Sequence, residues 1–414
     1  MLCVSTRGGP AISLSDAIAQ GLAPDGGLYI PVETPGASLK AGSLAQIARQ
    51  LVAPYFTNEN IELDTVCGAA FTFEAPVRAL GANNYSLELF HGPTAAFKDF
   101  GARFLAECLA RLTTEPTTIL VATSGDTGAA VAAAFHRRPG FRVVILYPDG
   151  RVAARQAHQL GAFGDNVHTF RVAGTFDDCQ RMVKAAFAND ALKSKLKLGS
   201  ANSISLGRLL PQMTYYAKAA LEIGPINLVV PTGNLGNALA CLMAKRMGVA
   251  IGEIVLATNA NHVLPDFLKT GRYSPKPSVA TLANAMDVGD PSNVERLRYW
   301  YPDESAMPFT ADWVDDETIR ATIRRTWADS NLAVCPHTAC GLEVLRRLRA
   351  KGASGRWVVA ATAHPAKFDS VVEPLIGQKV EVPAALGELL ARPAQATPLG
   401  ASEGEFARVL AELT

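Results

Sequence analysis

The stretch "INLVVPTGNLGNALACLMAKRMG", residues 226–248, carries the pattern that decides the fold. Its opening run of Ile, Leu and Val is typical of a buried strand, and its closing run of Ala, Leu and Met is typical of a helix. In the turn between them, Gly233 and Gly236 allow close backbone approach, while Asn234 and Asn237 tolerate left-handed geometry and donate hydrogen bonds. The stretch therefore predicts a strand, a tight turn and a helix.

The same alternation runs through two blocks of the chain, at about residues 117–173 and 226–362. Other strands are predicted at "TTILVATS", "FRVVILYP", "NVHTFRVAG", "EIVLATN" and "RWVVAATAHP". Strands that are apolar on both faces and alternate with helices indicate open parallel sheets of the α/β class. We expect two α/β domains and an N-terminal appendage, with these bounds: the appendage at 1–85, a large domain from 86–110 and 200–380, a small domain at 111–199, and a C-terminal tail at 381–414.

The composition argues against several classes of function. Of the 414 residues 49% are hydrophobic and 19% charged, and Lys plus Arg (39) nearly balance Asp plus Glu (38), for a net charge of +1. This balance gives no electrostatic footprint for nucleic acid or an anionic membrane, and no apolar run reaches membrane-spanning length. The seven scattered cysteines form no C-x-x-C, so we expect reduced thiols in a cytoplasmic protein. Cys335 and Cys340 flank His337 without a second ligand pair, so we expect no metal.

Ligands of open α/β sheets bind beyond the carboxyl ends of the strands, and one such end carries "TSGDTG", residues 123–128. Its backbone N–H groups, together with Ser124, Asp126 and Thr127, stand at the start of a predicted helix and suit a carboxylate or a phosphate. A plain strand-to-helix turn has the same composition, so both interpretations stay open.

The turn at residues 231–238 also follows a predicted strand, and its N–H groups and helix dipole suit a cofactor phosphate. Its G-x-x-G spacing is neither a dinucleotide fingerprint nor a Walker loop. At a third strand end, "ATAHPAKF", Thr362 offers a hydroxyl to a ring nitrogen. His364 and Lys367 are reactive residue types, although a His-Pro turn with an exposed lysine is structurally common.

A polar loop lies between the two blocks, in "LGSANSISLGRLLPQMTYY", residues 198–216. Asn202 belongs to this loop, and Arg208 falls on the first turns of the helix after it. An arginine placed there suits anion recognition through its planar fork of donors, and an ordinary surface arginine is the alternative.

Lys98, in "HGPTAAFKDFG" (residues 91–101), follows a small apolar run at a predicted helix start. Desolvation beside Phe97 and Phe100 would lower the pKa of this lysine and favour the neutral amine that attacks an aldehyde. A phosphate cradle, a hydroxyl for a ring nitrogen and a semi-buried lysine together suggest pyridoxal 5′-phosphate (PLP), which needs all three.

Seven motifs, taken together, closely resemble the threonine synthase family in its bacterial long form: "HGPTAAFKDFG", "TSGDTGAA", "GTFDDCQ", "SANSIS", "VVPTGNLGN", "NAMDVGDPSN" and "TAHPAKF". The opening "STRGG…APDGGLYIP" is similar to that family's N-terminal domain, and the similarity extends from about residue 4 to about residue 375. The resemblance implies PLP fold type II, the architecture of the tryptophan synthase β subunit. It also implies conversion of O-phospho-L-homoserine and water into L-threonine and phosphate.

The resemblance also implies roles for single residues. Lys98 would form the Schiff base, and Thr362 would meet the pyridine nitrogen. The cup for the PLP phosphate would comprise Gly233, Asn234, Leu235, Gly236 and Asn237. Ser124, Asp126 and Thr127 would face the substrate carboxylate and the edge of the cofactor ring, where many fold type II enzymes carry Asn in place of Asp126. Asn202 and Arg208 would face the substrate phosphate.

Two alternatives remain. A β-eliminating ammonia-lyase or a β-replacement synthase of the same fold would need no site for a substrate γ-phosphate, so Asn202 and Arg208 would be dispensable. A non-catalytic metabolite-binding protein would not need Lys98 together with an intact phosphate cup. A monomer and a homodimer are both compatible with the sequence.

Overall fold

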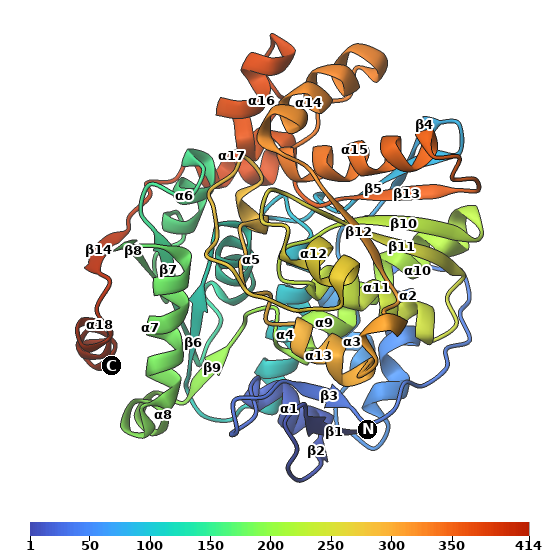
Figure 1. The fold of residues 1–414 in the computed structure, drawn as a ribbon. Helices are drawn as coiled ribbons and strands as arrows, with labels where there is room; N and C mark the ends of the chain where they lie inside the picture. The colour runs from blue at the N-terminus through green and yellow to red at the C-terminus, as the bar shows by residue number, and fades with distance from the viewer. Residues whose placement is uncertain (414) are drawn as a thin grey trace.

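The computed structural model describes residues 1–413 and places two parallel sheets side by side, with a small N-terminal module at the bottom of the view (Figure 1). The stretch 226–248 forms β10 (Ile226–Pro231) and α11 (Gly236–Arg246), as predicted. β10 pairs in parallel with β11 (Ile251–Thr258) on one side and with β13 (Trp357–Ala361) on the other. The predicted α/β class with open parallel sheets is confirmed.

The larger sheet has the order β12-β11-β10-β13-β5-β4, and only its edge pair β4–β5 is antiparallel. Alternate residues of β13 enter two cores: Trp357 and Val359 pack with α14 and α15, and Val358 and Ala360 pack with α10 and α11. The other strands are β12 (Thr310–Trp313), β5 (Asn84–Glu88) and β4 (Val77–Gly81). The helices are α4 (Lys98–Leu112), α10 (Met213–Ile223), α12 (Val263–Thr270), α13 (Val294–Trp300), α14 (Asp316–Ser330), α15 (Pro336–Ala350) and α16 (Asp369–Ile376).

The smaller sheet has the order β14-β8-β7-β6-β9 and is parallel throughout. Helices α5 and α6 cover one face, and α7 and α8 cover the other. Its elements are β6 (Thr117–Ala122), α5 (Asp126–Phe135), β7 (Phe141–Pro148), α6 (Ala154–Gly161), β8 (Val167–Ala173), α7 (Phe176–Ala188), α8 (Asp190–Leu196) and β9 (Leu198–Ser200). Both faces are apolar because helices cover both of them.

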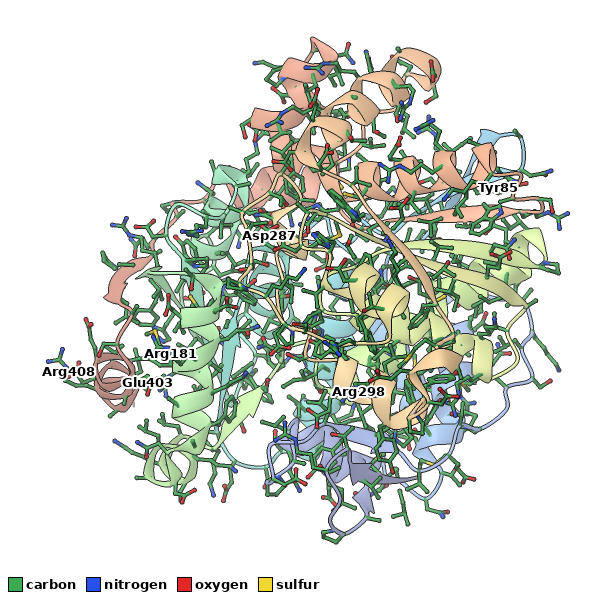
Figure 2. All side chains as sticks on the ribbon, viewed as in Figure 1. Tyr85, Arg181, Asp287, Arg298, Glu403 and Arg408 are labelled. Carbon is green, nitrogen blue, oxygen red and sulfur yellow. The ribbon has the colours of Figure 1, made fainter. Side chains whose placement is uncertain are left out.

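The end of the chain belongs to the smaller sheet. β14 (Thr397–Gly400) pairs with β8, and α18 (Glu403–Glu412) packs on α7. Arg181 of α7 and Glu403 of α18 lie side by side at this contact, with Nη1 and Oε1 2.7 Å apart (Figure 2). A shorter helix, α17 (Ala384–Leu390), precedes β14. The proposed domain bounds stay a prediction, and residue 85, where we set one of them, falls inside β5.

The N-terminal module contains a three-stranded antiparallel sheet of order β2-β1-β3 and packs on α4 and α10. Its elements are β1 (Leu2–Ser5), β2 (Ile12–Ser13), α1 (Leu14–Gln20), β3 (Tyr29–Pro31), α2 (Leu44–Val52) and α3 (Leu63–Ala70). Within residues 1–413, no helix is long and apolar enough to cross a membrane.

Candidate active site

A cleft of about 1090 Å³ opens between the two sheets and the N-terminal module. Its lining brings together residues from four of the predicted loops, namely Lys98, Ser124, Thr127, Asn202 and Asn234. These loops follow strand ends or begin helices. The fold brings them together around one cleft, as expected because ligands of open α/β sheets bind beyond the carboxyl ends of the strands. The cleft is therefore the candidate active site.

Lys98 is the first residue of α4 and lines the cleft. Its Nζ lies 4.5 Å from the centre of the Phe97 ring and has neither an ion pair nor a hydrogen bond within residues 1–413. Burial, and then the nearby charge of Arg208, lower the pKa of Lys98 to about 8. A substantial fraction of this amine is therefore neutral near physiological pH and can act as a nucleophile.

The loop before Lys98 is attached to the end of β13. Phe97 N donates to Thr362 O at 2.9 Å, His364 N donates to Ala95 O at 3.0 Å, and Ala96 and Ala363 form an isolated antiparallel bridge. Thr362 is 5% exposed, and its hydroxyl has no hydrogen bond in the described part of the chain. The backbone contacts therefore hold Thr362 close to the segment that carries Lys98.

The turn before α11 is shaped by close packing. Leu235 adopts a left-handed φ of 62°, and a Cβ at Gly233 would come within 2.8 Å of the backbone Cα of Met286. The Asn237 side chain accepts hydrogen bonds at Oδ1 from the hydroxyls of Tyr215 (2.5 Å) and Tyr216 (2.7 Å). These bonds orient the amide and leave Nδ2 buried without a partner within residues 1–413. A spare donor at an uncharged helix start suits a phosphate.

Arg208 lies in α9 (Leu206–Leu209) and is fully buried, so the alternative of a surface arginine is wrong. Its Nη1 donates to Ala201 O at 2.5 Å, whereas Nε and Nη2 have no hydrogen-bond partner among the described residues. A Cβ at Gly101, in the first turn of α4, would lie 3.0 Å from Arg208 Nε. Arg208 Nε therefore lies beside the first turn of α4, the turn that begins at Lys98, although Arg208 does not itself line the cleft.

Asn234 links the phosphate turn to the loop that contains Asn202. Its Nδ2 donates to Ser203 Oγ at 2.8 Å, and its Oδ1 accepts from Ser292 N at 2.6 Å. Asn293 donates from Nδ2 to Asn234 O (2.9 Å) and Ser203 O (3.4 Å). The two candidate anion sites thus share one hydrogen-bond network.

Arg296 anchors this network to the N-terminal module, a role for which we made no prediction. The fully buried guanidinium donates to Tyr29 O through Nε (3.0 Å) and Nη2 (2.8 Å), to Ile204 O, and to Asn293 Oδ1 at 2.7 Å. The polar run "NAMDVGDPSN" just before α13 was the available signal, because so many Asn, Asp and Ser residues indicate a loop with buried hydrogen bonds.

Asp126 and Lys367 form a buried ion pair, with Oδ1 and Nζ 2.7 Å apart. Lys367 also donates to Thr94 O at 2.8 Å, and Gln156 Nε2 donates to Asp126 Oδ1 at 2.8 Å. Burial alone would raise the pKa of Asp126, but Lys367 and His337 together lower it. The alternative of an exposed Lys367 is therefore wrong. Asp126 can reach a ligand only through Oδ2, so its predicted ligand contact stays a prediction.

His337 follows Cys335 at the start of α15. Cys335 is the N-cap residue, and its Sγ accepts from Thr338 N at 3.4 Å. Within residues 1–413, no group of three or more His, Cys, Asp or Glu side chains could hold a metal ion. Cys335 therefore has a capping role in the fold.

PLP requires an amine for its aldehyde, a cup for its phosphate and a partner for its ring nitrogen. Lys98 offers the amine, the turn with the spare Asn237 donor offers the cup, and the free Thr362 hydroxyl offers the partner. These residues fit the cofactor, and the parallel sheets with the Lys98 loop between them define the class, a PLP-dependent enzyme of fold type II.

Comparisons with known proteins agree with this class. The family described as "Pyridoxal-phosphate dependent enzyme" matches residues 73–363, "Threonine synthase N terminus" matches 3–71 and "Threonine synthase, C-terminal" matches 338–409. Threonine synthase of Serratia marcescens is 40% identical over 424 residues (96% of each chain), and that of Escherichia coli K12 is 40% identical over 399 residues (91% of each). The chain therefore belongs to the threonine synthase family, whose enzymes act in threonine biosynthesis.

Solved structures give the same result. The Escherichia coli threonine synthase crystal structure superposes with a TM-score of 0.93 at 36% identity, covering 100% of both chains. PLP-bound threonine synthase from Brucella melitensis gives 0.90 at 35% identity, covering 100% of this chain and 99% of that one. Maize serine racemase, at 17% identity over 80% of this chain and 94% of its own and a TM-score of 0.57, shares the fold.

Proposed function

We propose that the chain converts O-phospho-L-homoserine and water into L-threonine and phosphate, with Lys98 as the reactive amine. The observation that supports this substrate most directly is the buried Arg208 guanidinium, whose Nε and Nη2 lack partners within residues 1–413 beside the first turn of α4. A second set of anion donors, separate from the cofactor cup, suits a substrate that carries its own phosphate.

The overall reaction breaks the Cγ–O bond of the substrate, and the electron pair leaves with phosphate. Cβ loses one proton and takes the hydroxyl of water, Cγ gains one proton in place of the phosphate, and the remaining proton of water balances the released phosphate. Bound PLP would supply an electron sink for these changes. Lys98 Nζ would carry protons at Cα and Cβ, which a pKa near 8 allows because both protonation states are accessible.

The other residues would bind and orient. Ser124 and Thr127 line the cleft at the start of α5 and would hold the substrate carboxylate. Asn202 and Arg208 would bind the departing phosphate, whose charge increases as the bond breaks. Asn234 would hold these two regions in register through Ser203. A cytoplasmic location and a monomeric or homodimeric state belong to the same proposal.

The test compares Arg208→Lys with the unmodified chain on two kinds of substrate. The lysine keeps the charge but loses the planar fork, so kcat/KM for O-phospho-L-homoserine should fall by about a hundredfold or more. Slow side reactions with serine, which has no γ-phosphate, should hardly change, and the absorbance of bound PLP should be intact. Equal losses on both substrates would contradict this role and would show that Arg208 supports the fold or the cofactor site instead, whereas no loss on either substrate would favour the ammonia-lyase or β-replacement alternative.

A further inference from the structure

The His337 ring has a defined tautomer. His337 is 2% exposed, and its Nε2 accepts a hydrogen bond from Ala285 N at 3.0 Å. Burial lowers the pKa of His337 to about 4, so the ring is neutral at pH 7. Because an accepting Nε2 carries no proton, the proton of the neutral ring sits on Nδ1. Nδ1–H is therefore a hydrogen-bond donor.

That donor is buried without a hydrogen-bond partner within residues 1–413. Nearby buried donors are used: Lys367 Nζ meets Asp126 and Thr94 O, and Gln156 Nε2 meets Asp126. Leaving a buried donor unpaired costs free energy, so an unpaired one beside a binding cleft indicates a ligand acceptor.

The surroundings of His337 restrict the acceptor. The charged groups that act on it are Asp126, Lys367 and Lys98, and Phe368 packs against its ring with centroids 5.0 Å apart. PLP carries its 3-hydroxyl on the ring carbon next to the one that bears the aldehyde. A PLP aldehyde bound to Lys98 would therefore place the 3-oxygen close to Lys98. Asp126 is a poor partner for that oxygen, because Lys367 and Gln156 hold it as a carboxylate, which can only accept hydrogen bonds.

We propose that His337 is a cofactor-binding residue whose Nδ1–H donates to the 3-oxygen of PLP. This inference rests on the proposed placement of the cofactor at Lys98. His337 then has two separate functions: Nε2 holds the backbone at Ala285, which lines the cleft, and Nδ1 holds the cofactor ring.

Two substitutions separate these functions. In His337→Asn the side-chain amide nitrogen can take the position of Nδ1, which keeps the donor and loses the acceptor for Ala285. In His337→Gln the terminal oxygen can take the position of Nε2, which keeps the acceptor and loses the donor. His364→Gln is the matched control, since it makes the same substitution at a histidine whose Nδ1 has no proton to donate. That nitrogen accepts a hydrogen bond from Ala366 N at 3.2 Å.

The experiment titrates each apoprotein with PLP and with 3-deoxy-PLP, in which hydrogen replaces the 3-hydroxyl. His337→Gln should weaken PLP binding by about ten- to a hundredfold, as expected for a hydrogen bond to a charged acceptor. Its affinity for 3-deoxy-PLP should match that of the unmodified protein. His337→Asn should retain most of the PLP affinity, and His364→Gln should change neither affinity.

The proposal is wrong if His337→Gln weakens both ligands equally, or if His337→Asn loses as much PLP affinity as His337→Gln. If one variant does not fold, the other still tests the proposal through its ratio of affinities for the two ligands. An unchanged PLP absorbance in Lys98→Ala would instead overturn the proposed cofactor site, so the two failures are distinguishable.

Discussion

The turns that begin α5 and α11 follow parallel strands in the same way, yet they differ in charge. The first turn of α5 contains Asp126, which is paired with Lys367, whereas the first turn of α11 contains no acid and has the spare donor of Asn237. A carboxylate at a helix start already compensates the positive end of the helix dipole. Gly, Ser and Thr in a turn therefore do not by themselves define a phosphate site, and the charge of the turn must be considered too.

The largest effect is expected from breaking the pair at the α5 turn. Lys367→Met leaves Asp126 buried without its cation, which should lower the free energy of unfolding by about 3–5 kcal/mol. Urea denaturation of the apoprotein measures this loss. Adding Asp126→Asn should recover most of it, because the amide is neutral. An unchanged stability in Lys367→Met would show that Asp126 does not depend on this lysine.

Making the α11 turn resemble the α5 turn should weaken cofactor binding. Asn237→Asp keeps an acceptor for the hydroxyls of Tyr215 and Tyr216, but it removes the spare donor and places a negative charge near the PLP phosphate. The Kd for PLP should rise by about a hundredfold. The matched control is Asn227→Asp at the other end of β10, where Oδ1 accepts from Glu253 N. Equal effects of both changes would exclude a local charge effect.

The two glycines of the α11 turn should differ in importance. A Cβ at Gly233 would lie 2.8 Å from backbone at Met286, whereas a Cβ at Gly236 would lie 3.3 Å from the Cβ of Ser203. Since backbone yields less easily than a loop side chain, Gly233→Ala should weaken PLP binding by about tenfold and Gly236→Ala by less. PLP titration of both apoproteins gives the comparison, and the reverse order would contradict this packing argument.

The remaining prediction concerns Lys98, which has no ion-pair partner within residues 1–413. The pKa of Lys98 is about 8 in the folded protein, against an ordinary value of 10.5. Between these two pH values the unfolded chain therefore binds more protons than the folded protein does. The contribution of Lys98 to the free energy of unfolding should therefore rise with pH over this window. Lys98→Met should remove that rise in urea denaturation of the apoprotein. Identical pH dependence in both proteins would contradict the lowered pKa.

Local features of the fold could be predicted because they depend on neighbouring residues. The residue types of the stretch 226–248 predict its strand and its helix, and both form as β10 and α11. In "TFDDCQ", Thr175 stands shortly before two acidic residues, a pattern that predicts a helix start, and its hydroxyl accepts from Asp178 N in a capping box. Lys98 was expected at a helix start from the apolar run before it, and α4 begins at this residue.

Long-range features could not be predicted, because their partners are far apart in the chain. The sequence could not distinguish a buried Arg208 from a surface arginine, since its burial depends on α4 and Gly101. Lys367 likewise resembled an exposed turn residue, and only the folded chain brings Asp126 to it. From the sequence, the C-terminal tail was expected to lie apart from the two α/β domains. The parallel pairing of β14 with β8 could not be foreseen, because it has no local signal.

The order of strands in the larger sheet has a consequence for how the chain folds while it is being translated. β13 separates β5 from β10 and is one of the last elements to be translated, although β5 is translated early. The loop before Lys98 is bonded to the end of β13 through Thr362 and His364. Until the ribosome has released these residues, the sheet is divided into two parts and the amine has no fixed surroundings. A nascent or truncated chain that ends before β13 should therefore be unable to assemble the cofactor site.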